Sequence, residues 1–170
     1  MKRTSILGFI LLFFITPILS QADVLFLGPS EFVPIEEGQG YMRSPFTGLS
    51  MPTDGPSSYA FYYAAIHLPE GAKITAVTLF YIDNCAGYIN FWVVRQKQYD
   101  QSFLGDVIIS GSTSGAAAGW RNTKFTGVDM KYNKILNDSC TYYVEVSFSG
   151  YPQSYDVLSF HGIKIFYNLP

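Results

Sequence analysis

The sequence predicts an all-β fold: an antiparallel β-sandwich of jelly-roll type with about eight strands. Three observations lead to this prediction. Short runs rich in Val, Ile, Thr, Tyr and Phe recur along the chain, separated by Gly, Pro, Asn, Asp and Ser. In several runs apolar and polar residues alternate, as on a strand with one buried face. No segment shows a convincing helical period.

The N-terminus has the pattern of a secretory signal peptide, residues 1–22. Lys2 and Arg3 precede an apolar run over residues 6–18, and small residues at Ser20 and Ala22 suit a signal peptidase. We expect cleavage after Ala22, with cleavage after Ser20 as the alternative. The apolar run is shorter than the roughly 20 residues that a membrane anchor needs. Residues 23–170 are then one sandwich domain.

The composition of the remaining chain restricts its partners. It has 170 − 22 = 148 residues and a formal charge of (11 − 2) − 13 = −4. This mild acidity does not fit a nucleic-acid partner, which requires a clustered basic surface. Abundant Tyr and Phe are atypical of disordered chains. No later apolar run is long enough to span a membrane as a helix. We therefore expect a secreted or periplasmic folded protein with no transmembrane segment after signal cleavage.

The order of strands follows from the runs and turns. In residues 66–95, strand-like runs at 73–82 and 88–94 flank the turn 83–87, which predicts a β-hairpin near the middle of a sheet. Residues 36–57 read as a long connection with at most one short strand, of a length that is often functional. Further strands are expected at residues 23–27, 58–68, 103–110, 120–125, 142–148 and 157–167.

The clearest alternation is near the C-terminus. In residues 142–148, Glu145 and Ser147 point to one face, and in residues 157–167 Lys164 points outward. The opposite, inward positions are apolar: Tyr142, Val144, Val146, Phe148, Ile163, Ile165 and Tyr167.

The two cysteines suggest a disulfide. Cys85 lies in the 83–87 turn, and Cys140 precedes the run 141–148. An exported chain meets oxidising conditions, so an even pair at strand ends predicts a Cys85–Cys140 bond. It would close a loop of 140 − 85 = 55 residues, which is worth about 4 kcal/mol in the chain-entropy model. The alternative is two unpaired thiols in different loops.

Several segments carry a resemblance to a known group. Residues 32–34 (Phe-Val-Pro), 68–75 (Leu-Pro-Glu-Gly-Ala-Lys-Ile-Thr) and 80–84 (Phe-Tyr-Ile-Asp-Asn) resemble a loose group of exported bacterial proteins. Residues 142–146 and 162–167 fit the same group. The resemblance implies a jelly-roll-like β-sandwich and export from a bacterial cell. Because the group has no assigned activity, no catalytic or binding residue is carried over.

Metal and cofactor chemistry has little support. His67 and His161 lack the spacing of a zinc site, which needs three or four ligands. Asp83 and Asn84 offer oxygens to calcium, with Asp138 if a disulfide brings the two loops together. Calcium takes six or more oxygens, and Asp-Asn is ordinary turn chemistry. We predict no metal site and no cofactor.

Catalytic patterns are equally weak. Residues 111–115 have Thr113 where a nucleophile elbow has serine. Ser159 and His161 would lie on one face of a strand, but no acidic partner is evident. A glycosidase needs two carboxylates facing each other across a cleft, and the sequence does not show which acidic residues come together. We predict no catalytic residues, and a hydrolase is the least favoured hypothesis.

The aromatic residues are the unusual feature. Sugar rings stack on exposed Trp and Tyr, although the same side chains also fill sandwich cores. We therefore predict an exported, non-enzymatic β-sandwich that binds a glycan or another envelope partner. The alternative is a structural or assembly subunit of the cell envelope or of an extracellular complex. The candidate ligand-binding residues are Trp92, Tyr99, Trp120, Tyr151 and Tyr155.

Overall fold

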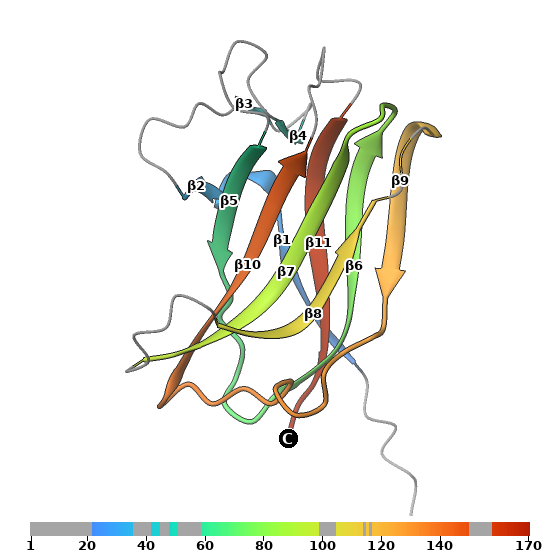
Figure 1. Ribbon diagram of the computed structural model, residues 1–170. Helices are drawn as coiled ribbons and strands as arrows, with labels where there is room; N and C mark the ends of the chain where they lie inside the picture. Colours follow the sequence, from blue (N-terminus) through green and yellow to red (C-terminus); the bar gives the residue numbers. More distant parts are fainter. Residues whose placement is uncertain are drawn as a thin grey trace, which may run out of the picture.

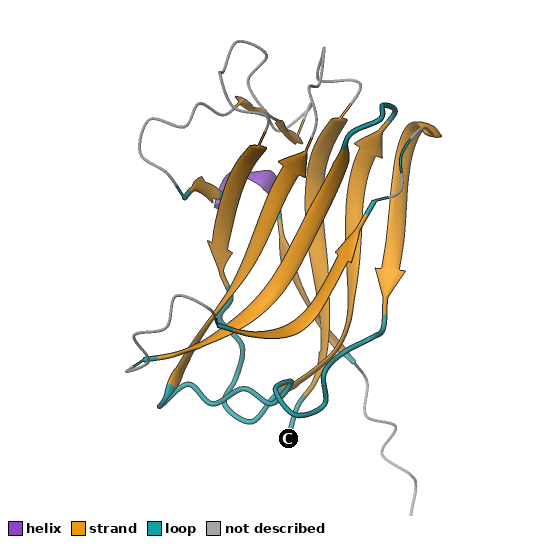
Figure 2. Ribbon diagram, in the orientation of Figure 1, coloured by secondary structure: helices purple, strands orange, loops and turns teal. Residues whose placement is uncertain are grey.

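The predicted β-sandwich is confirmed. The computed structural model describes residues 22–35, 42–44, 48–50, 59–98, 105–113, 115, 117–149 and 158–170. Within these ranges it contains eleven strands and one short 3-10 helix, η1 (Pro29–Glu31), and no α-helix. Figures 1 and 2 show two layers of strands stacked face to face. The predicted signal peptide lies outside the described residues except for Ala22.

The six-stranded sheet has the order β3-β4-β11-β6-β9, and β1 also pairs with β11. All of its pairings are antiparallel. The long strands β6 and β11 form its centre and β9 forms one edge. Its strands are β1 (Asp23–Leu27), β3 (Met42–Ser44), β4 (Gly48–Ser50), β6 (Lys73–Asp83), β9 (Ala117–Phe125) and β11 (Leu158–Asn168).

The five-stranded sheet has the order β2-β5-β10-β7-β8 and is also antiparallel. In Figure 1 it is the nearer layer. Its strands are β2 (Val33–Pro34), β5 (Tyr59–Ala65), β7 (Tyr88–Lys97), β8 (Asp106–Ser112) and β10 (Cys140–Ser149).

The strand order is that of a jelly roll. Eight strands have five or more residues: β1 and β5 to β11. Numbered along the chain, these eight run first-eighth-third-sixth in one sheet and second-seventh-fourth-fifth in the other. The predicted number of about eight strands therefore matches the number of long strands. Two of the three short strands, β3 and β4, lie in the connection 36–57, for which at most one was expected.

The hairpin predicted within residues 66–95 is wrong. β6 belongs to the six-stranded sheet and β7 to the five-stranded sheet, so the turn between them crosses from one layer to the other. Both strands have the apolar, β-branched composition that a sandwich core requires of either layer. Composition therefore identified the strands but not their partners.

The core lies between the layers and is filled by the inward positions of both. The alternation predicted for β10 is confirmed, because Val144 and Val146 are fully buried while Glu145 is half-buried. β11 likewise buries Ile163 and Ile165, and Lys164 faces outward. Figure 2 shows that strands supply nearly all of both layers.

The predicted Cys85–Cys140 disulfide is also wrong: both cysteines are free. Cys85 lies just before β7 begins at Tyr88, whereas Cys140 pairs with Lys97 at the other end of β7. The ten residues of β7 span about 30 Å. Because β7 and β10 are antiparallel neighbours, their first residues lie at opposite ends of the sandwich (Figure 1), far beyond the roughly 7 Å that a disulfide bridges.

In the part of the chain that the structure describes, no helix has the length and apolar character needed to cross a membrane.

Candidate functional site

The outer face of the five-stranded sheet carries a row of three large side chains. Glu145 on β10 pairs with Tyr63 on β5 and with Trp92 on β7. Directly opposed residues on neighbouring strands project to the same face. The residues flanking Glu145 on β10 are buried in the core, so this row faces away from the core. Two aromatic rings thus stand on either side of one carboxylate.

A fourth side chain extends this surface. Tyr143 lies two residues before Glu145 on β10 and projects to the same face. Tyr63 is 42% exposed, while Trp92 and Tyr143 are half-buried. On the next row, Asn90 Nδ2 donates to Ser147 Oγ over 3.3 Å. The surface therefore offers aromatic rings, a carboxylate and hydrogen-bonding groups side by side.

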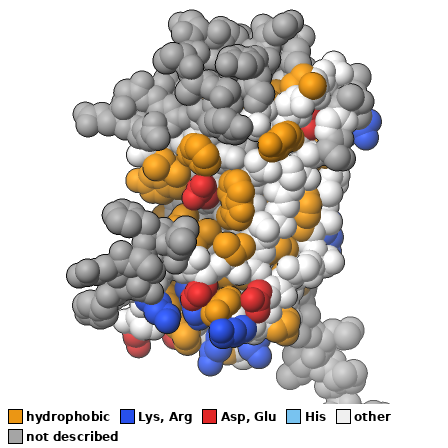
Figure 3. Space-filling view, viewed as in Figure 1, with side chains coloured by type: hydrophobic (Ala, Val, Ile, Leu, Met, Phe, Trp, Pro, Cys, Tyr) orange, Lys and Arg blue, Asp and Glu red, His pale blue; other side chains and the backbone are white. Residues whose placement is uncertain are grey.

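The surface is hollowed beside Glu145. A groove of about 460 Å³ runs along β5 and β10, a size typical of small-molecule sites. In Figure 3 hydrophobic side chains gather over the middle of this sheet, with acidic atoms between them. We call this hollow the face groove. The residues that line it are Ile35, Tyr63, Ala65, Thr141, Tyr142, Tyr143 and Glu145.

Partial burial changes the acidity of two groups in the face groove. It raises the pKa of Glu145, because a carboxylate shielded from water is harder to ionise. It also raises the pKa of Tyr143, and the negative charge of Glu145 adds to that effect. No cation contributes to the shift at Glu145. Among the described residues, the Glu145 carboxylate lies between aromatic rings and forms no ion pair.

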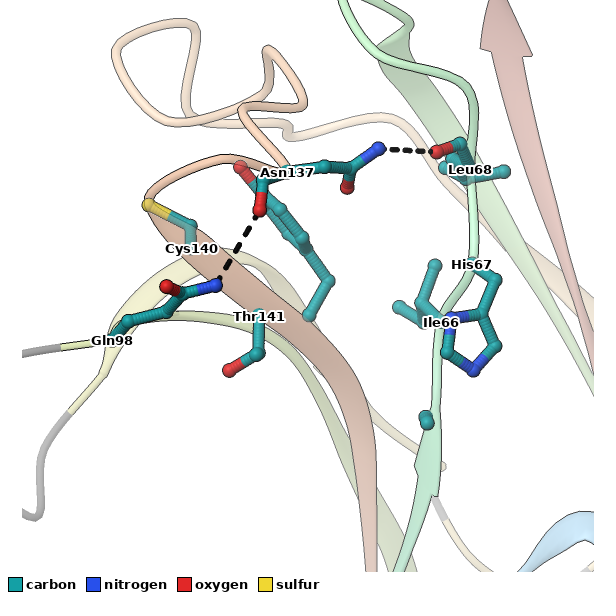
Figure 4. Close-up of a pocket in the computed structure, with 9 residues that line it drawn as sticks. Ile66, His67, Leu68, Gln98, Asn137, Cys140 and Thr141 are labelled. Atoms are coloured by element: carbon teal, nitrogen blue, oxygen red, sulfur yellow. Dashed lines mark hydrogen bonds between the residues drawn. The ribbon is translucent and has the colours of Figure 1, made fainter.

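A second hollow of about 350 Å³ lies where β5 ends, and we call it the end hollow. Figure 4 shows the segment carrying Ile66, His67 and Leu68 on one side and β10 on the other. One hydrogen bond joins the sides, from Asn137 Nδ2 to the Leu68 carbonyl over 3.0 Å. On the β10 side, Gln98 Nε2 donates to the Asn137 carbonyl over 3.5 Å.

Cys140 and His67 both line the end hollow, a combination that recurs in cysteine hydrolases. In Figure 4 they lie on opposite sides of it. The Cys140 thiol is buried, and its sulfur lies 3.7 Å from Ser139 Oγ. A nucleophile needs its base within about 3 Å, so this arrangement is not that of an activated thiol.

Among known proteins, this chain shows a weak structural similarity and no sequence match. No family model matches the chain, and no curated protein matches it. A solved structure of TmCBM61 in complex with β-1,4-galactotriose is similar over 85% of this chain and 86% of that chain, with 9% sequence identity and a TM-score of 0.34. A likeness this weak decides nothing about the ligand, and the fold assignment above rests on the strand order.

Two of the five residues predicted to bind ligand are described, and they lie on different sheets. Trp92 lies on the five-stranded sheet, in the row with Glu145. Trp120 lies on β9 of the other sheet and is 66% exposed. The remaining candidates, Tyr99, Tyr151 and Tyr155, lie outside the described residues.

The sequence reasoning did not single out Tyr63, Tyr143 or Glu145 as a site. Alternation in residues 142–148 did place Glu145 on the outward face. What was missing was the register, because Tyr63 and Trp92 become neighbours of Glu145 only through strand pairing. That information is non-local.

The Ser159 and His161 side chains share a face, as predicted. Ser159 Oγ and His161 Nε2 are 2.8 Å apart, and the His161 ring packs against Trp120 with ring centroids 3.8 Å apart. Ser159 is fully buried, and burial lowers the pKa of His161, which favours the neutral imidazole. A serine with no exposed surface cannot reach a substrate, so the pair has a structural role.

The oxygens considered for calcium are far apart. Asp83 ends β6 at one end of the sandwich, whereas Asp138 precedes β10 at the other. Asp83 is buried and accepts a hydrogen bond from Thr113 Oγ1 through Oδ2, while its Oδ1 has no hydrogen-bond partner among the residues that the structure describes. Among the described residues, no three His, Cys, Asp or Glu side chains are grouped to hold a metal.

Proposed function

We propose that this protein binds carbohydrate on the outer face of its five-stranded sheet. The observation that carries the proposal is the row Tyr63–Glu145–Trp92, extended by Tyr143. The apolar C–H faces of a sugar pack against aromatic rings, while its hydroxyls need polar partners at the ring edge. This surface supplies both within adjacent rows of one sheet.

Glu145 is the central hydrogen-bonding group of the proposed site. An ionised carboxylate accepts several hydrogen bonds and donates none, which suits a ligand rich in hydroxyls. Within the described part of the chain Glu145 forms no ion pair, so its oxygens are open to a ligand. Partial burial also strengthens each bond that it accepts.

A binding role fits the face groove better than hydrolysis. Glycosidases use two carboxylates about 5–10 Å apart across the scissile bond. Glu145 is the one carboxylate among the described residues that line the face groove. A single acceptor between aromatic rings can hold a sugar but has no acid or base partner.

Export of the protein stays part of the proposal. The signal-peptide pattern of residues 1–22 supports a secreted or periplasmic location, where glycans are accessible. N-terminal sequencing of the protein recovered from outside the cytoplasm is expected to begin at Asp23. An intact Met1 on the exported protein would contradict this part of the proposal.

An assembly subunit is the second candidate function. The observation that favours it is an apolar patch on β1, where Val24 and Phe26 are 47% and 51% exposed. If β1 forms an interface between subunits, light scattering will show an oligomer that Phe26→Ser converts to a monomer. A monomeric parent protein would remove this candidate.

The carbohydrate proposal is tested with a pair of tryptophan variants. The purified protein is screened on an array of neutral and acidic glycans, and the strongest ligand is titrated by calorimetry against Trp92→Ala and Trp120→Ala. Both substitutions remove one indole, but only Trp92 belongs to the row. Loss of binding in Trp92→Ala alone supports the site. No glycan binding, or equal loss in both variants, contradicts it.

A further inference from the structure

The face groove and the end hollow share three lining residues, Ala65, Thr141 and Tyr142. We infer that they form one continuous groove along β5 and β10, and that the end hollow is a second subsite for the same ligand. The inference rests on the proposed function and specifies its ligand: an oligosaccharide of several units that runs past the end of the sheet.

The end hollow exists because β5 leaves β10 there. The two strands pair as far as Tyr143 and Ala65, and Ile66 N–H donates to the Tyr142 carbonyl over 2.8 Å. Beyond that bond β10 stays paired with β7, through Thr141 and Cys140, while the segment with His67 turns away. The separation opens the end hollow (Figure 4), which adjoins the face groove through their shared lining residues.

The distance between the two hollows requires a ligand of more than one sugar. Thr141 lies four residues before Glu145 on β10, which corresponds to about 13 Å along a strand. Each hollow alone lies within the typical range for a small-molecule site. A single pyranose on Glu145 cannot also fill the end hollow, whereas a linear chain lying along β10 contacts both.

The end hollow is more polar than the face groove. Its wall carries the amides of Gln98 and Asn137 and the exposed side chains of Thr141 and His67. Each amide donates one hydrogen bond to a backbone carbonyl, which fixes its orientation, and an amide NH₂ has a second hydrogen. Amides held in advance lose little entropy on binding. This chemistry suits the hydroxyls of a terminal sugar unit.

The inference predicts that affinity depends on chain length. Oligosaccharides of one to five units, of the class selected by the array, are titrated against the parent protein. Affinity is expected to rise by about 25-fold once the chain reaches the end hollow, because two neutral hydrogen bonds of about fivefold each multiply. Equal affinity for all chain lengths would overturn the inference.

Two substitutions locate the gain. Ala65→Trp places an indole at the junction of the two hollows and is expected to reduce the affinity for long chains to that for short chains. Gln98→Ala should lower the affinity for long chains about fivefold and leave the affinity for short chains unchanged. The matched control is Asn122→Ala, because Asn122 is a polar residue exposed on the other sheet. Circular dichroism confirms that each variant folds.

The outcomes separate the inference from the proposed function. If Trp92→Ala abolishes binding but the affinity of the parent protein does not depend on chain length, the face groove binds sugar and the end hollow does not. If Trp92→Ala has no effect on any glycan, the proposed function itself fails. If Ala65→Trp weakens short and long chains equally, the two hollows are one site, which also contradicts the inference.

Discussion

The two outer faces of the sandwich both carry aromatic rings, but different groups surround them. On the five-stranded sheet, Tyr63 and Trp92 flank the carboxylate of Glu145. On the six-stranded sheet, Lys164 Nζ lies 5.3 Å from the centre of the Phe80 ring, and Lys124 Nζ lies 4.8 Å from that of Phe166. One face holds an acceptor among its rings, whereas on the other face lysines lie over the rings of Phe80 and Phe166.

This difference indicates how each face is used. On the six-stranded sheet the rings also meet each other, as Phe26 and Phe80 do edge to face with centroids 6.3 Å apart. Their favourable contacts are therefore made within the protein. On the five-stranded sheet the half-buried Glu145 carboxylate has a raised pKa and forms no ion pair with any residue that the structure describes. We expect the six-stranded face to contribute to stability and the five-stranded face to binding.

The largest expected effect is on stability, at Gly162 of β11. Gly162 has φ = +134°, and a Cβ there would lie 2.7 Å from the Phe26 ring and 3.0 Å from the Leu27 carbonyl oxygen. Gly162→Ala should therefore lower the free energy of unfolding by about 3 kcal/mol, measured by urea denaturation. Glycan affinity of the folded variant should not change. A stable variant would show that β1 packs loosely on this face.

The second effect is on binding, at Trp92. Removing the ring of a central contact residue typically costs about 2 kcal/mol, or roughly 30-fold in affinity. Trp92 is half-buried on an outer face, so the Trp92→Ala substitution should lower the urea midpoint of unfolding less than Gly162→Ala does. Calorimetry and urea denaturation on the same sample check both statements. A large loss of stability without a loss of affinity would reverse the roles assigned to the two faces.

The third effect is a pH dependence at Glu145. Its pKa is raised in the folded protein, so its ionised form is lost at a higher pH than for an ordinary glutamate, and glycan affinity should fall as the pH drops through that pKa. The expected loss is about 1 kcal/mol, or roughly fivefold. Glu145→Gln should abolish the dependence. A similar pH profile in Glu145→Gln would assign it to another group.

The same shift has the opposite sign for stability. Because the folded state binds the Glu145 proton more tightly than the unfolded state, the contribution to stability is full below the unfolded pKa. It is lost as the pH rises through the raised folded pKa. Glu145→Gln should therefore be slightly more stable than the parent at neutral pH. Binding and stability thus favour opposite protonation states of one group, as expected for a residue kept for its ligand.

Local pattern predicted which residues form strands and which face each residue takes. Alternation was enough to bury Val144 and Val146 and to leave Glu145 outward, because side-chain direction repeats every two residues whatever the partner strand is. It was not enough to pair the strands. Residues 73–82 and 88–94 read as a hairpin, yet the short turn between them connects two layers.

The wrong disulfide and the separation of Trp92 from Trp120 have the same origin. Cys85 and Cys140 both lie next to strand starts, and only the antiparallel pairing of β7 with β10 puts those starts at opposite ends. Trp92 and Trp120 were equivalent candidates in the sequence. The register places one beside Glu145 and the other beside His161 on the opposite face. Pairing and register are non-local, so no window of sequence contains them.

The smallest expected effect concerns the lysines of the six-stranded face. An exposed cation–π contact is worth about 0.5–1 kcal/mol, so Lys164→Met should lower the free energy of unfolding by about 0.5 kcal/mol because methionine keeps the apolar contact with Phe80. Neutral-glycan affinity should be unchanged, because Lys164 and Glu145 lie on opposite sides of the sandwich. The control is Lys134→Met, which changes an exposed lysine that makes no cation–π contact among the described residues. A loss of glycan affinity in Lys164→Met alone would move the binding surface to the six-stranded sheet, since no contact links Lys164 to the face groove.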